Sequence, residues 1–435
     1  MIIRFVTENW RSFRDEAELN MTATRERQHN ERLPIVQTFD MKLLPVAAIY
    51  GANAAGKTKF IEALAYFQQL IIDGTGTRSG NDAIQIPRFK LDTGSLSKPT
   101  KFAIDVIIED SIYSYSVSLL SDRVLEEKLI IEDENNTYDV FDRNDGRPIS
   151  FDHKYFSSDD LETLRVIEKV TRKNQLFLTQ AIQLNMNKFA PLYEWFANKL
   201  IIITPELGYA AINRLGNKDD VMGNQITRLI KELGTGIDHF ELIDLDGKPT
   251  SLEMKAIQAN EHLLRKSIPV RAGSTILINE DGEIVRKKLL SIHQSREGNN
   301  VPFELGEESE GTIRMLDLAP AFWLLKNEPI KDAVIVIDEL DRSLHSNLLE
   351  WLIKYYLNSC NERTRSQLIF TTHDVTILTQ EIFRRDELWG IDKDFYGASN
   401  IYSFRDFKDV RRDKDIRKLY LSGFIGAVPK IIGRE

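Results

Sequence analysis

The chain has 435 residues, of which 42% are apolar and 28% are charged, and its formal net charge is −9. This composition is typical of a globular protein large enough for two or three domains. We expect a cytoplasmic protein without a membrane partner, because no stretch resembles a signal peptide and no apolar run could span a bilayer. The single cysteine, Cys360, excludes an intramolecular disulfide and a cysteine-based metal site.

The acidic balance also argues against a protein that wraps the phosphate backbone of nucleic acid, so any nucleic-acid contact would have to be local. The basic pairs Arg384–Arg385 and Arg411–Arg412 are interleaved with aspartates. Mixed charges of this kind predict solvated faces of the molecule, not a phosphate-binding stripe.

The predicted elements begin with β-strands. The opening residues alternate apolar and polar side chains, which predicts antiparallel, half-buried strands. The apolar run 43–50 is too short for a helix and leads into a glycine-rich turn, as a central strand does. Residues 57–71 have apolar side chains at helical spacing, and 101–142 form several strands joined by Asp-, Asn- and Gly-containing turns.

The middle of the chain has a different character. Helical periodicity over 159–182 and 189–200 predicts a helical insertion from about residue 157 to 234. Residues 237–290 mix short strands with a helix around 256–267. A helix and a strand then alternate twice, as in α/β proteins, over residues 310–326, 333–338, 344–357 and 367–373.

A phosphate-binding motif follows the strand at 43–50. It fits the pattern GxxxxGK(S/T) and lies between an apolar strand and a helix, which is the context that a P-loop requires. Its glycines permit tight torsions that turn backbone N–H groups toward phosphates, and the helix N-terminus adds partial positive charge. The sequence therefore predicts that ATP is bound by Gly51, Ala52, Asn53, Ala54, Ala55, Gly56, Lys57 and Thr58.

A second motif supplies two carboxylates. The apolar strand at 334–337 ends in Asp338 and Glu339, as Walker B strands do. We expect Asp338 and the hydroxyl of Thr58 to hold Mg²⁺, Glu339 to act as general base toward water, and Lys57 to contact the β- and γ-phosphates.

Three further features indicate which class of P-loop protein this is. Ser309 and Gly311 lie in a segment that opens a helix shortly before Walker B, where Ser309 is placed to cap the helix and to bind the nucleotide of a second protomer. His373 follows the strand at 367–372. Asp341 lies just after Walker B, where we expect the loop to cross a dimer interface. Each feature has an ordinary structural interpretation too: a common helix start, a structural histidine and a helix-start acid.

With these residues identified, the chain resembles the SMC-like ABC ATPases of prokaryotic phage-defence operons, the group that includes the ATPase subunits of Septu, PARIS and retron systems. The P-loop and Walker B are generic to many families. More specific are the opening NWRSFRDEAELNMTA, the signature form EESEGT and the tail from Arg384 to Phe407 with YLSGFIGAVP. The signature separates the chain from transporter ATPases, whose segment usually reads LSGGQ.

The resemblance implies an α/β, ABC-type P-loop ATPase with a mixed β-sheet core and an inserted, mainly helical domain. We expect the ATPase domain to comprise residues 1–156 and 285–435 and the insertion to comprise 157–284. The resemblance also implies Mg²⁺-dependent ATP hydrolysis, a homodimer or higher homo-oligomer, and a separate effector, a nuclease or toxin. The related OLD nucleases carry a Toprim domain after the histidine; here the tail is too short for one and Asp392–Asp394 lacks paired glutamates, so an intrinsic nuclease is not expected.

Three alternatives stay open. One is a P-loop kinase, but Glu339 beside Asp338 and the late histidine suit hydrolysis better. A DNA repair or maintenance ATPase would clamp DNA on ATP binding, but its insertion should be a long coiled coil, and no heptads occur here. A transporter motor would need membrane partners and usually the LSGGQ form. We favour a sensor or scaffold that controls its effector.

Overall fold

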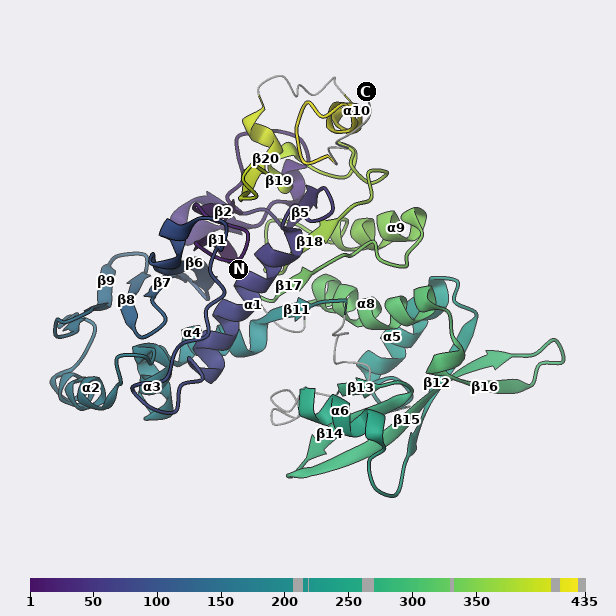
Figure 1. Cartoon of the computed structure of the whole chain (residues 1–435). Helices are drawn as coiled ribbons and strands as arrows, with labels where there is room; N and C mark the ends of the chain where they lie inside the picture. Colours follow the sequence, from purple (N-terminus) through teal and green to yellow (C-terminus); the bar gives the residue numbers. More distant parts are fainter. Residues whose placement is uncertain (206–213, 218, 260–269, 329–331, 408–414, 429–435) are drawn as a thin grey trace. The chain divides into compact units, whose positions relative to one another are not determined.

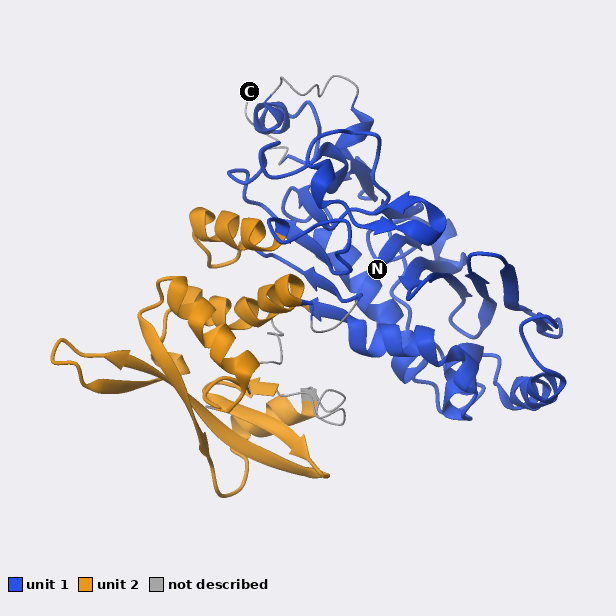
Figure 2. Ribbon diagram, turned by 180° about the vertical axis from the view of Figure 1, so that it is seen from behind, with its two compact units in different colours: residues 1–202, 328–340, 357–435 blue, residues 203–327, 341–356 orange. Residues whose placement is uncertain are grey.

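The computed structural model describes residues 1–205, 214–217, 219–259, 270–328, 332–407 and 415–428 (Figure 1). The chain forms two compact units, which Figure 2 colours separately: unit 1 comprises residues 1–202, 328–340 and 357–435, and unit 2 comprises residues 203–327 and 341–356. Unit 1 thus combines the two ends of the chain. The segment expected as an insertion is divided between the units, since its residues 157–202 lie in unit 1 and 203–284 in unit 2.

Unit 1 contains a seven-stranded antiparallel sheet with the strand order β10-β9-β8-β7-β6-β1-β2. Its strands are β1 (Ile2–Glu8), β2 (Ala17–Asn20), β6 (Thr100–Ile108), β7 (Ser111–Leu119), β8 (Val124–Glu132), β9 (Thr137–Asn144) and β10 (Ser150–Phe151). Buried positions alternate with more accessible, mostly half-buried ones along much of β6 and β7, as in strands with one face on the core. The predicted antiparallel strands at the start of the chain and over 101–142 are confirmed.

The second sheet of unit 1 has six strands in the order β11-β17-β18-β5-β19-β20. They are β5 (Val46–Gly51), β11 (Leu200–Ile203), β17 (Val334–Ile337), β18 (Gln367–Thr372), β19 (Leu388–Lys393) and β20 (Ser399–Ser403). Strands β17, β18, β5 and β19 are parallel, and β20 pairs antiparallel with β19. Every residue of β5, β17 and β18 is buried, which explains why β5 and β17 are continuously apolar and why β18 has an apolar centre at 368–370. The mixed α/β fold class is confirmed.

Helix α1 (Lys57–Asp73) follows β5 after the turn of the P-loop. Its buried face carries Phe60 and Phe67, whose rings contact Phe5 of β1 and Phe102 of β6 at centroid distances of 5.5 and 5.4 Å. Ile49 of β5 belongs to the same hydrophobic core. Each fully buried Phe side chain contributes about 1.5–3 kcal/mol, so this core fixes the helix that starts at the P-loop.

The helix predicted over 159–182 is interrupted. The structure has α2 (Ser158–Val170) and α3 (Phe177–Gln183) instead. Between them, the guanidinium of Arg143 donates to the carbonyl oxygens of Gln175 and Arg172 at 2.6 and 3.2 Å. The buried carboxylate of Glu127 accepts the N–H groups that start α3, at 2.7 and 2.9 Å. These two tertiary partners satisfy the backbone groups of the break, which outweighs the helical pattern.

Unit 1 also contains several short elements. They are β3 (Ile35–Val36), β4 (Met41–Lys42), α4 (Ala190–Glu194), a π-helical turn (Trp195–Lys199) and α10 (Ile416–Leu421). The pattern predicted over 189–200 corresponds to α4 and the π-helical turn.

Unit 2 has its own sheet and core. Its strands are β12 (Ile237–Asp244), β13 (Val270–Ala272), β14 (Thr275–Glu280), β15 (Glu283–Gln294) and β16 (Asn300–Glu304), in the order β12-β15-β14-β13 with β16 also on β15. Its helices are α5 (Val221–Glu232), α6 (Ser251–Ala259), α8 (Glu310–Asn327) and α9 (Ser346–Leu357). The part of the helix expected around 256–267 that follows residue 259 lies outside the described residues. The hydrophobic core of the unit joins α5, α8 and β15 through Ile226, Leu316 and Leu289.

Across the described ranges, none of the helices combines the length and apolarity that a bilayer crossing demands.

Candidate functional site

Three neighbouring parallel strands of unit 1 end at one edge of the six-stranded sheet. Strand β5 ends at Gly51, β17 ends at Ile337 and β18 ends at Thr372. Because the strands are adjacent and parallel, the residues that follow them meet at the carboxyl edge of the sheet (Figure 1). Those residues are the P-loop with Lys57, the carboxylates of Asp338 and Glu339, and the imidazole of His373.

Lys57 lies in the first turn of α1 and is buried. Its ammonium donates to the carbonyl oxygens of Gly51 and Ala52 at 2.8 and 3.2 Å. It also lies 3.4 Å from Nδ1 of His373. This last contact joins the P-loop to the end of β18, and it requires that Nδ1 of His373 carries a lone pair toward the ammonium.

The turn of the P-loop depends on its glycines. Gly56 has a φ of 121°, and a Cβ added there would lie 2.5 Å from Oγ of Ser399 and 2.9 Å from Oγ of Ser12. A Cβ on Gly51 would lie 2.7 Å from the carbonyl oxygen of Ile391. In the same motif, Asn53, Ala54 and Thr58 are exposed. The loop therefore packs tightly on β19 and β20 and presents its other face to solvent, which fits a phosphate-binding loop.

The two carboxylate residues after β17 share one partner, Thr371 of β18. The hydroxyl of Thr371 donates to Oδ1 of the buried Asp338 at 2.5 Å. The same oxygen accepts the backbone N–H of Glu339 at 2.8 Å. Glu339 is half-buried and has a φ of 50°, a left-handed conformation that costs about 1–3 kcal/mol in a residue other than glycine. Thr371 thus fixes the carboxylate of Asp338 and supports the strained backbone from which the side chain of Glu339 projects.

The match to a protein family decides the class. The family model described as "AAA domain, putative AbiEii toxin, Type IV TA system" matches residues 46–379, a span that includes the P-loop, Asp338, Glu339 and His373. The chain belongs to this family. It is accordingly an AAA-domain protein of the ATP-binding ATPase kind. No curated protein matches the chain.

Solved structures with a similar fold include two SMC heads. The SMC head domain from Thermotoga maritima is 14% identical, with a TM-score of 0.38, over 92% of this chain and 98% of that one. An SMC head bound to the C-winged helix domain of ScpA is 13% identical, with a TM-score of 0.40, over 92% of this chain and 97% of that one. These similarities are remote, so the role of each residue in the AAA-domain chain has to come from its own geometry.

Ser309, Gly311 and Asp341 of this AAA-domain protein lie in unit 2, whereas Lys57, Asp338, Glu339 and His373 lie in unit 1. The expected cap is present: Oγ of Ser309 accepts the N–H of Thr312 at 3.1 Å at the start of α8. Gly311 allows a close approach, because an added Cβ would lie 3.0 Å from the carbonyl oxygen of Ser343. Ser309 is exposed, so its hydroxyl is accessible beside the helix N-terminus.

Sequence reasoning missed three residues that shape the site. They are Thr371, Ser399, whose hydroxyl reaches the P-loop, and Trp10, whose indole N–H donates to the carbonyl oxygen of Lys59 at 2.9 Å in the first turn of α1. The pair of threonines directly before His373 was a usable signal for Thr371. Nothing local in the sequence indicates Ser399 or Trp10, since both act across long separations.

The prediction of a solvated face at Arg384–Arg385 was wrong for Arg384, which is fully buried. Its guanidinium makes a two-pronged contact with Asp386 at 2.8 and 2.9 Å, and Asp386 also accepts from Thr24. Next to it, Arg32 pairs with the fully buried Glu387. Burial raises the pKa of Glu387 to about 7, although Arg32 favours the charged form. Arg411 and Arg412 lie outside the described residues.

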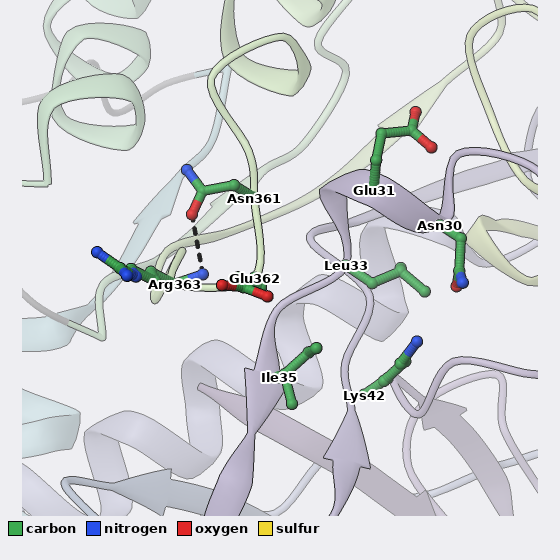
Figure 3. A pocket seen from close by; sticks show the side chains of 8 residues that line it. All are labelled: Asn30, Glu31, Leu33, Ile35, Lys42, Asn361, Glu362 and Arg363. Carbon is green, nitrogen blue, oxygen red and sulfur yellow. Dashed lines mark hydrogen bonds between the residues drawn. The ribbon is translucent and has the colours of Figure 1, made fainter.

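Unit 1 also has a separate hollow of about 650 Å³, and Figure 3 shows the side chains that line it. It lies between the β3–β4 hairpin with the segment before it and the turn at 361–363, and its lining carries both charges. The lining residues are Asn30, Glu31, Leu33, Ile35, Lys42, Asn361, Glu362 and Arg363. None of them belongs to the sheet edge that bears Lys57 and Asp338.

Proposed function

We propose that this AAA-domain protein hydrolyses ATP with Mg²⁺ and closes as a homodimer, or a higher homo-oligomer, around the nucleotide, and that closure controls a separate effector in anti-phage defence. The observation that supports it is the meeting of Lys57, Asp338, Glu339 and His373 at the carboxyl ends of three adjacent parallel strands. A P-loop lysine, a buried aspartate, a neighbouring glutamate and a histidine are groups suited to phosphoryl transfer to water.

Each residue has a distinct task in this proposal. The P-loop N–H groups and Lys57 bind the phosphates, which replace the loop's own carbonyl oxygens as partners of the ammonium. Thr58 and Asp338 supply the oxygens for Mg²⁺, which neutralises charge on the phosphate oxygens when bound. Glu339 accepts the proton of the attacking water, and His373 contacts the terminal phosphate from the end of β18.

We infer the dimer from the position of Ser309. Ser309 is exposed, and its hydroxyl caps the N-terminus of α8. The hydroxyl can donate a hydrogen bond, and the helix N-terminus adds partial positive charge, so together they suit an anionic ligand. We infer that Ser309, with Gly311 and Asp341 from the same unit, contacts nucleotide held by the P-loop of a second copy. The nucleotide then links two protomers.

The effector part rests on the family and on the chemistry of the site. The family description places the matched AAA domain in a TA system and names that domain as its toxin; the TA system supports pairing with a second protein. In our proposal the groups gathered at the sheet edge serve nucleotide hydrolysis, and we assign a nuclease or toxic activity to a separate protein.

The first experiment measures ATP hydrolysis and oligomeric mass together for the wild type, Lys57→Ala and Glu339→Gln, with and without ATP. We expect both variants to lose hydrolysis and Glu339→Gln alone to accumulate an ATP-dependent dimer, because binding is retained while turnover is blocked. Glu283→Gln, an exposed glutamate on β15, is the matched control and should behave as wild type. A Glu339→Gln protein that stays monomeric with ATP would refute closure.

The defence role has its own test. The chain is expressed with the adjacent reading frames of its operon, and phage plating is compared with that of the Lys57→Ala version. We expect protection to require both the neighbour and Lys57. Protection by the chain alone, or ATP-dependent DNA binding in a gel shift without any partner, would favour the DNA-clamp alternative.

A further inference from the structure

The hydroxyl of Ser399 contacts the P-loop from β20, on the side of the loop that is packed against the sheet. Ser399 is the first residue of β20 and is 1% exposed. Its Oγ donates to the carbonyl oxygen of Ala55 at 2.5 Å. Its own backbone N–H donates to the carbonyl oxygen of Ser12 at 2.7 Å, so the strand end is anchored to the loop between β1 and β2. Ser399 is therefore a fixed point against which the P-loop rests.

The acceptor of this hydrogen bond lies in the peptide unit that joins Ala55 to Gly56. A trans peptide unit is planar, and its C=O and N–H point in opposite directions. Fixing the carbonyl of Ala55 toward β20 therefore fixes the N–H of Gly56 away from β20. Gly56 has a φ of 121°. Because glycine has no side chain to restrict its torsions, its backbone can also adopt other conformations at little cost.

We propose that Ser399 is a positioning residue of the nucleotide site: by holding the carbonyl of Ala55, it aims the N–H of Gly56 at the β-phosphate of the bound nucleotide. The inference rests on the proposed nucleotide binding and concerns a part of the ligand that ATP and ADP share. Without the hydroxyl, the peptide unit samples other orientations, and binding must first restore the right one.

Ser12 provides an internal comparison. Its hydroxyl lies close to the position of a Cβ on Gly56, at 2.9 Å. Among the described residues, however, Oγ of Ser12 is buried without a hydrogen-bond partner. Ser12 and Ser399 thus form one wall behind Gly56, and only the hydroxyl of Ser399 orients the peptide unit.

The test compares Ser399→Ala with two matched serine variants of the full chain. Ser403→Ala removes a hydroxyl from the same strand at an equally buried position, where it accepts from the N–H of Arg405 instead. Ser12→Ala removes the other hydroxyl of the wall. Dissociation constants for MgATP and MgADP, KM and kcat for hydrolysis, and the nucleotide-free melting temperature are measured for each.

For Ser399→Ala we expect the dissociation constants of MgATP and MgADP to rise by the same factor, about three- to tenfold, as one hydrogen bond lost predicts. KM should rise with them while kcat stays within about twofold, because Gly56 binds the ground state and the transition state alike. The melting temperature should stay within about 2 °C of wild type, and both control variants should bind nucleotide as wild type does.

Unchanged dissociation constants in Ser399→Ala would overturn the inference, as would an equal loss in Ser12→Ala or Ser403→Ala, since packing and not the hydrogen bond would then be responsible. These outcomes differ from a failure of the proposed function, in which the wild type itself would not bind nucleotide.

Discussion

The hydroxyl of Thr371 lies 2.5 Å from Oδ1 of Asp338. Through the N–H of Glu339 the same hydroxyl also contacts the neighbouring residue. One side chain on β18 therefore orients both acidic residues at the end of β17, while His373 follows it after a single residue. The strand that delivers the histidine is also the strand that arranges the carboxylates, so the two parts of the site cannot shift independently.

Replacing Thr371 by the isosteric Val removes the donor to Asp338 and the acceptor of the Glu339 N–H. A hydrogen bond to a charged group contributes about 1.5–3 kcal/mol, which corresponds to at least a tenfold effect. We expect ATP hydrolysis to fall at least about tenfold, with a much smaller change in nucleotide affinity because the P-loop is intact. Phosphate release and nucleotide titration measure the two effects.

Thr372→Val is the control for this substitution. Thr372 lies next in the strand, but its hydroxyl accepts the N–H of Asp374. A Thr371→Val protein that hydrolyses ATP at the wild-type rate would show that the contact with Asp338 does not matter for turnover.

The strand, turn and helix over residues 46–73 and the strand before Asp338 were predictable, because the local sequence pattern alone specifies them. A strand of buried apolar residues followed by glycines and a lysine has few other uses, and α1 begins at Lys57 as expected. Ser399 and Trp10 were not predictable, because they reach the P-loop and α1 from 344 and 49 residues away in the chain. The break between α2 and α3 was missed for the same reason: Arg143 and Glu127 come from strands, and the sequence does not show that they will meet it.

Gly56→Ala tests the backbone of the P-loop. The substitution combines an unfavourable φ of 121° with an approach of 2.5 Å to Oγ of Ser399. We expect nucleotide binding to be lost, and the free energy of unfolding to fall by about 1–3 kcal/mol. Gly76→Ala separates the two causes, because Gly76 also has a positive φ, 70°, but an added Cβ would meet nothing within 4 Å. A Gly56→Ala protein that binds ATP normally would contradict the assignment of this loop.

Ser309 serves the helix and, in our proposal, the nucleotide of a second copy, and two substitutions separate these roles. Ser309→Ala removes the cap on α8 and should lower the free energy of unfolding by about 1 kcal/mol. Ser309→Asp retains a good cap, so stability should be close to wild type, but its negative charge opposes phosphate.

In the Glu339→Gln background, we therefore expect Ser309→Asp to abolish the ATP-dependent dimer without loss of stability. Urea unfolding and mass measurement give the two readouts. A dimer that survives Ser309→Asp would place the intermolecular contact elsewhere.

The buried pair Arg384–Asp386 shows where charge patterning misleads. In sequence, two basic residues followed by two acidic ones at 384–387 look like a solvated face, yet these side chains bind the segment that contains Thr24 and Arg32. A charged residue can be buried when it finds a partner of opposite charge in a fixed geometry. Arg32, the partner of Glu387, lies 355 residues away in the chain. Composition alone carries no such information.

Glu387 makes the stability of the protein depend on pH. Its pKa is raised from 4.5 to about 7, chiefly by burial, with Arg32 and Arg384 opposing the shift and Asp386 adding to it. The folded state therefore binds more protons than the unfolded state between these values. The contribution of protonated Glu387 is complete below pH 4.5 and is lost as the pH rises toward about 7.

Glu387→Gln removes this titration while keeping the shape of the side chain. We expect the free energy of unfolding of the wild type to fall relative to that of Glu387→Gln as the pH rises from about 5 to about 8, by up to about 3 kcal/mol. Urea unfolding at each pH measures the difference, and Glu31→Gln, whose carboxylate is largely exposed, should run parallel to the wild type. Parallel curves for the wild type and Glu387→Gln would mean that Glu387 keeps the same charge in the folded and unfolded states across this range. In that case its contact with Arg32 would outweigh the cost of burial.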